Sequence, residues 1–163
     1  MNNANNYYLE YYGYNRSEGA KMTEKYLPPV LKGEKKMDVS EEYFNLNLTN
    51  LTNNQKINYL EKWYFELPEP RIEIKGSYMI VNAIFTLALL INNLEIAEKW
   101  ALISCDYDGS RNLAGEGKFN LGEVKFLQGK KDEARKYFTE VYKIAGIRPF
   151  KDKNPEYQKL INK

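Results

Sequence analysis

The sequence predicts an all-α protein in which antiparallel helical hairpins stack side by side, as a short solenoid or a bundle. Apolar residues recur at helical spacing, as at Ile57, Leu60, Tyr64 and Leu67, and short breaks rich in Pro, Gly and Asn separate such stretches. The alternating run at 71–75 has no partner run, so we expect a connector there and not a strand.

Capping residues and helix breakers place the first two helices. Ser40 precedes two glutamates and is expected to cap a helix over 40–48. Asn53 is expected to cap a second helix over 54–66, which Pro68 ends because proline does not continue a helix.

The second half of the chain repeats this rhythm. Ser77 opens a run that is apolar on nearly every face and, at about 14 residues, is shorter than the roughly 20 needed to cross a bilayer, so we expect a buried central helix and no membrane span. Turns are expected at Asn92, at Asp108 to Ser110 and at Gly129, with a C-cap at Gly146. The further helices are expected over 94–107, 114–128, 130–145 and 154–162.

These elements divide the chain into an arm and one helical domain. Residues 1–39 are predicted to form a polar arm rich in Tyr and Asn, with a short helix over 18–27. The N-terminal stretch lacks the basic and apolar pattern of a secretory signal, which predicts a cytoplasmic protein. The domain, 40–163, is expected to hold hairpins at about 40–67, 77–107 and 114–146, followed by a capping helix at about 154–162.

Composition bears on the function. The 163 residues include no histidine and one cysteine, which excludes nucleophiles activated by an imidazole base and zinc sites built on histidine. We therefore expect no catalytic site, no metal and no cofactor. The net charge of +2 argues against direct nucleic-acid binding.

Two groups of residues allow a chemical interpretation that we weigh against a structural one. Cys105 lies near a helix end beside Asp106 and Asp108, which would raise the thiol pKa and leave it inert. Asp106, Asp108 and Glu116 suggest a carboxylate hydrolase or a calcium loop, but the remaining oxygen ligands are missing. Turn chemistry at a helix end explains these residues more simply.

A small-residue pattern lies within the hairpin at 114–146. Small residues let two helices approach closely, a glycine allows a tight turn, and an aromatic ring fills the gap to the next hairpin. The residues in question are Leu121, Gly122, Gly129, Ala134 and Phe138. They resemble the signature of the tetratricopeptide repeat. A shift of 37 residues places Ala97 on Ala134 and Ala101 on Phe138, which gives a second, degenerate copy. An all-α bundle with an accidental match is the alternative.

The resemblance implies a binding surface. In tetratricopeptide repeats the first helix of each pair lines a concave face, which corresponds here to Asn82, Thr86, Phe119 and Glu123. A pair of hydrogen-bonded core side chains is the alternative for Asn82 and Thr86, which lie four residues apart.

The leading functional hypothesis is a module that binds another protein. The tail from Ile147 to Leu160 resembles the ends of small bacterial tetratricopeptide-like proteins, some of them presumed immunity proteins of polymorphic toxin systems. This resemblance implies a cognate toxin domain as partner, neutralised by occlusion. An adaptor or chaperone that holds a peptide in the concave groove is the alternative. Residues 39–113 carry 6 basic and 10 acidic side chains (−4) and residues 114–163 carry 12 and 7 (+5), a split suited to steering a charged partner.

Overall fold

The computed structural model describes residues 37–110 and 115–161, and in this part of the chain the protein is all-α. The predicted arm, apart from its last three residues, and the predicted helix over 18–27 lie outside the described residues. The α-helices are α3 (Ser40–Asn45), α4 (Asn53–Glu66), α5 (Ser77–Leu90), α6 (Leu94–Ser110), α7 (Glu116–Leu127), α8 (Lys131–Ala145) and α9 (Pro155–Ile161), and the 3-10 turns are η1 (Arg71–Glu73) and η2 (Arg148–Phe150).

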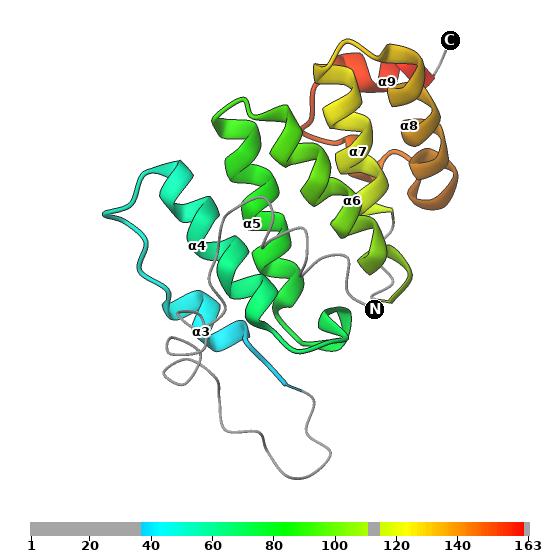
Figure 1. Cartoon of the computed structure of the whole chain (residues 1–163). Helices are drawn as coiled ribbons and strands as arrows, with labels where there is room; N and C mark the ends of the chain where they lie inside the picture. The colour runs from blue at the N-terminus through cyan, green and yellow to red at the C-terminus, as the bar shows by residue number, and fades with distance from the viewer. Residues whose placement is uncertain (1–36, 111–114, 162–163) are drawn as a thin grey trace.

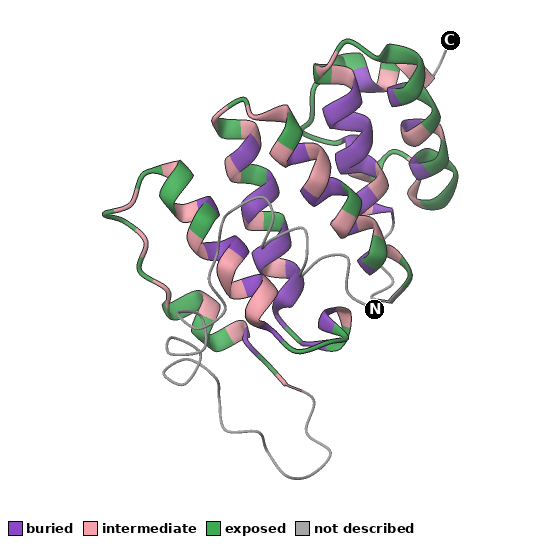
Figure 2. Cartoon of the chain, in the orientation of Figure 1, coloured by how far each residue is buried: buried purple, intermediate pink, exposed green. Residues whose placement is uncertain are grey.

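The helices pack in the order of the sequence. From α4 to α8, each long helix lies against the helix that follows it, and α9 folds back against α8 (Figure 1). The buried residues follow these facing sides (Figure 2) and form two clusters. The larger cluster joins α4, α5, α6 and one side of α7, and the smaller cluster joins α7, α8, η2 and α9. This arrangement confirms the predicted all-α fold.

Several predicted helix ends are wrong by a few residues. The first helix ends at Asn45, not at residue 48, and Ser40 is its first residue, whose N–H donates to Asp38 Oδ1 at 2.9 Å. Thr52, not Asn53, is the N-cap of α4, because its hydroxyl and the Gln55 side chain form a reciprocal capping box.

The predicted stop at Asp108 is also wrong. Helix α6 continues to Ser110 through Gly109, which costs a helix only about 1 kcal/mol relative to alanine. The expected connector at 71–75 holds η1 and a single parallel bridge between Lys75 and Asp38.

The small residues of the α7–α8 hairpin lie where helices touch. A Cβ on Gly122 would lie 2.6 Å from the Phe138 ring, and one on Gly117 would lie 2.6 Å from the Cα of Cys105 in α6. The turn after α7 is made by Gly129 with φ +78°. The expected packing residues Ala97, Ala101, Leu121, Ala134 and Phe138 are all buried. Any closely packed pair of helices requires small residues and buried apolar side chains at the contact, so this packing does not depend on which helical family the chain resembles.

Candidate functional site

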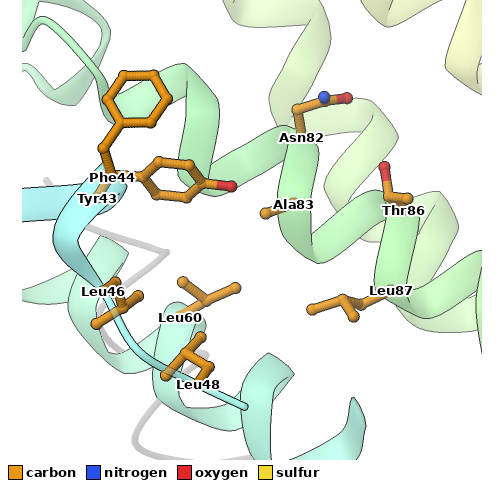
Figure 3. Close-up of a pocket in the computed structure, with 9 residues that line it drawn as sticks. All are labelled: Tyr43, Phe44, Leu46, Leu48, Leu60, Asn82, Ala83, Thr86 and Leu87. Atoms are coloured by element: carbon orange, nitrogen blue, oxygen red, sulfur yellow. The ribbon is translucent and has the colours of Figure 1, made fainter. Parts of the chain in front are cut away.

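An apolar groove opens between α3, the loop that follows it, and α5 (Figure 3). Its volume is about 510 Å³. Seven of its lining residues are aromatic or aliphatic and two are polar; they are Tyr43, Phe44, Leu46, Leu48, Leu60, Asn82, Ala83, Thr86 and Leu87. We call this the α3–α5 groove. An open apolar surface with a few polar groups is typical of a binding site.

The outer wall of the groove is a short helix held at both ends. At the start of α3, Val39 N–H donates to the Lys75 carbonyl at 2.8 Å, and Lys75 Nζ lies 2.7 Å from Asp38 Oδ2. Hydrogen bonds from Lys75 and Ser40 lower the pKa of Asp38 to about 2. Further along, the Tyr43 ring stacks on Trp63 of α4, with centroids 6.5 Å apart. These contacts fix α3 beside α4 although it has only six residues.

The inner wall is the exposed stripe of α5. Asn82 and Thr86 line the groove, and Leu90 continues the stripe beyond it; the three follow one another at intervals of four residues and are all exposed, Leu90 to 69%. The helix expected to be the buried central one is therefore exposed along this stripe, and Asn82 and Thr86 are not core side chains. Figure 3 shows Leu87 pointing from α5 towards Leu60 of α4 and Leu48 of the loop after α3. Among the described residues, no helix covers this stripe of α5.

The other two predicted partner-binding residues lie in the interior. Phe119 is 4% exposed and packs against Phe138, Phe150 and Tyr157. Glu123 accepts a hydrogen bond from the Tyr157 hydroxyl at 3.2 Å. The chain's own C-terminal segment covers this part of α7, so the four predicted positions do not form one surface. Only Asn82 and Thr86 lie on the groove.

The groove residues of α3 and of the loop that follows it were absent from the predicted binding set. They fall within the helix that the sequence predicts over 40–48, and they are Tyr43, Phe44, Leu46 and Leu48. The sequence contained a signal for this: Phe44 and Leu46 lie two residues apart, so in a helix they would point to different sides. In the structure the helix ends at Asn45, and Phe44 is 74% exposed.

Two acidic side chains lie directly before Tyr43 and Phe44 in the sequence. Glu41 and Glu42 are both exposed, and Glu41 lies three residues before Phe44, on the same side of the helix. Desolvation raises the pKa of Glu42, and the nearby charges of Asp38 and Glu41 add to that rise. Among the described residues, Glu41 and Glu42 therefore place negative charge beside the apolar surface of the groove.

The residues weighed for chemistry have structural surroundings. Cys105 is half-buried, and desolvation with the charges of Asp108 and Asp106 raises the pKa of its thiol to about 11. The Asp108 carboxylate accepts from Gly117 N–H at 2.8 Å and Lys118 N–H at 3.2 Å, and so caps the start of α7. Within residues 37–110 and 115–161, no three His, Cys, Asp or Glu side chains come together as metal ligands.

No helix in the described part of the chain combines the length and the apolar character that crossing a membrane requires. Comparisons with protein-family models, with curated proteins and with solved structures find no match to this chain.

Proposed function

We propose that this chain is a protein-binding module whose partner docks on the α3–α5 groove. The observation that carries the proposal is Phe44, a large aromatic side chain that is 74% exposed at the edge of an apolar groove. A buried aromatic anchor surrounded by weaker contacts is how protein interfaces gain most of their affinity.

The partner is expected to combine an apolar side chain with basic groups. The apolar side chain would fill the space between Tyr43 and Leu87, and a Lys or Arg beside it would face Glu41 and Glu42. Opposite charges speed the encounter and fix its orientation more than they add affinity.

Toxin neutralisation is the form of this function that the resemblance of the tail favours. Binding would act by occlusion in the cytoplasm: the acidic end of this chain would cover a basic, substrate-binding surface of a cognate toxin domain. The −4 balance of residues 39–113 supports that orientation.

The test is complex formation with the product of the adjacent upstream gene. We expect a stable complex on size exclusion, weakened about tenfold or more by Phe44→Ser. Leu102→Ser is the matched control, because Leu102 is also exposed, at 54%, but lies on α6 outside the groove. An unchanged complex with Phe44→Ser would exclude the groove, and the lack of any complex would count against toxin neutralisation.

Peptide holding remains the second candidate because of Asn82 and Thr86. An amide and a hydroxyl on the exposed side of α5 are suited to bind the backbone of an extended peptide. Peptide-array binding that is lost with Asn82→Ala would favour this function. A substitution at Glu123, the predicted concave position on α7, would not test this function, because Glu123 is covered by α9.

A further inference from the structure

The described part of the chain begins beside the α3–α5 groove. Lys75 N–H donates to the Met37 carbonyl at 3.0 Å, and the Met37 side chain packs against the larger buried cluster. The point at which residues 1–36 join the described part is therefore fixed at the start of α3. The far end of α3 carries Tyr43 and Phe44, which line the groove.

The walls of the groove define what it can bind. They are mostly aromatic and aliphatic, and among the described residues no side chain covers Phe44, which is 74% exposed (Figure 3). Asn82 and Thr86 add an amide and a hydroxyl, both of which can donate a hydrogen bond. A suitable occupant offers apolar side chains together with backbone carbonyls that need a donor.

One segment of the arm has this chemistry. Residues 27–31 read Leu-Pro-Pro-Val-Leu. A proline has a carbonyl but no N–H, and two prolines in a row favour the extended polyproline II conformation. That conformation has three residues per turn, which would place Leu27 and Val30 on one side. Grooves lined by aromatic side chains bind such segments because these lose little conformational entropy on binding.

The segment is near enough along the chain to reach the groove. Only residues 32–36 separate Leu31 from Met37, so these two residues can lie up to about 20 Å apart. Helix α3 has six residues and is about 9 Å long, which is well within that reach. A connection this short gives the segment an effective concentration on the order of 1 mM at the groove.

We infer that residues 27–31 dock in the α3–α5 groove of their own chain. Leu27 and Val30 face the apolar walls, and the proline carbonyls accept hydrogen bonds from Asn82 and Thr86. Even a contact with a Kd of about 1 mM would keep the groove occupied for about half of the time. The inference does not depend on the proposed function, because the contact needs no other protein. A partner that uses the groove would have to displace the segment, which lowers its apparent affinity.

The first test compares two double variants of the full chain by amide NMR. Leu27→Ser with Val30→Ser removes the apolar side of the segment. Leu9→Ser with Tyr12→Ser is the matched control, because these residues also lie three apart in the arm. We expect the first pair to shift the amide resonances of the groove residues and the control to leave them in place. The shifts should be equal at about 0.05 mM and about 1 mM protein, because the contact lies within one chain.

The second test traps the contact as a disulfide in a Cys105→Ser background. Val30→Cys with Ala83→Cys places one thiol in the segment and one in the groove. Val30→Cys with Leu102→Cys is the control, because Leu102 is exposed on α6 outside the groove. A disulfide requires its two Cα atoms to come within about 7 Å. Under mild oxidation the first pair should link within one chain about tenfold or more faster than the second.

Three results would overturn the inference. The first is a set of groove resonances that stay in place in the Leu27 and Val30 variant, or that move as far in the control. The second is an equal rate of disulfide formation in the two thiol pairs. The third is a shift that appears only at high protein concentration, which would mean that a second copy supplies the segment. None of these measurements involves a partner, so complex formation with another protein is judged separately.

Discussion

Gly122 shows how much the hairpin of α7 and α8 depends on a single missing methyl group. A Cβ there would lie 2.6 Å from the Phe138 ring, which is fully buried and stacked on Tyr157, so the ring has no room to move. We expect Gly122→Ala to lower the free energy of unfolding, because overpacking costs roughly 1–3 kcal/mol against a gain in helix propensity of about 1 kcal/mol.

The matched control is Gly109→Ala in α6, since none of the described residues lies within 4 Å of a Cβ at that position. Alanine there should raise the free energy of unfolding by about 0.5–1 kcal/mol. Chemical denaturation of both variants measures the difference. Equal effects of the two substitutions would show that the helices can separate to accept a methyl group.

A chain of hydroxyl groups joins α4, α5 and α6 inside the larger cluster. The Tyr64 and Tyr107 hydroxyls are 3.1 Å apart, and Tyr107 donates to Ser77 Oγ at 3.0 Å. Ser77 in turn lies 2.8 Å from the Arg71 carbonyl. We expect Tyr107→Phe to lower the free energy of unfolding by roughly 1–3 kcal/mol, because it leaves the Tyr64 hydroxyl buried without this partner.

Tyr142→Phe is the control for this substitution, because Tyr142 is 44% exposed and water can replace any bond of its hydroxyl. Its effect should stay within about 0.5 kcal/mol. Denaturant titration of both variants measures the difference. If Tyr107→Phe lowers the free energy of unfolding no more than Tyr142→Phe does, the buried Tyr64 hydroxyl finds another partner.

At the scale of the helices, Asp108 links α6 and α7, which the sequence analysis predicted as separate helices. It lies in the last turn of α6 and accepts the first N–H groups of α7. Asp108→Ala should cost about 1 kcal/mol, the usual loss for a helix cap. Asp106→Ala, two residues earlier and exposed, should cost much less. Equal losses in thermal unfolding would contradict the capping role.

The attachment of α3 is expected to depend on pH. The pKa of Asp38 in the folded protein is about 2, below the ordinary value of 3.8. The Asp38–Lys75 pair therefore stabilises α3 above pH 4 and loses that effect as the pH falls towards 2. Trp63 reports on α3 because it stacks on Tyr43. Its fluorescence should change in this window, and the change should be smaller in Asp38→Asn.

Protonation of Glu42 should act in the opposite direction. Desolvation and, after it, the charges of Asp38 and Glu41 raise the pKa of Glu42, so its protonation as the pH falls relieves these unfavourable contributions. The difference between wild type and Asp38→Asn isolates the Asp38 contribution. Identical titrations of the two proteins would show that Lys75 does not hold α3 through this carboxylate.

Periodicity and breakers were sufficient to predict the all-α fold and most helix limits, because amphipathic stripes and turn residues are local signals. The end of α6 was missed because Asp108 accepts hydrogen bonds from a different helix, which no local pattern contains. Asn82 and Thr86 could be predicted as binding residues because they are polar residues in an otherwise apolar helix. The burial of Phe119 was missed because it depends on where α9 folds back, a contact between distant parts of the chain.

For the whole molecule, packing in sequence order implies that stability is local. The two buried clusters meet along α7, since Leu121 and Val124 belong to the larger one and Phe119 to the smaller. In such a row, a defect at one end weakens its neighbours first. Tyr157 is the residue at which a substitution should create such a defect, because it is 3% exposed and its ring stacks on Phe138.

We expect Tyr157→Ala to speed amide hydrogen exchange in α7, α8 and α9 by far more than in α4 and α5. Removing this ring also frees the Glu123 carboxylate, whose hydrogen bond from Tyr157 is lost. Phe44→Ser, at the other end and exposed, should leave exchange rates in all these helices nearly unchanged. Uniformly faster exchange in Tyr157→Ala would instead show that both clusters unfold as one unit, and the α3–α5 groove would then depend on the C-terminal helix for its stability.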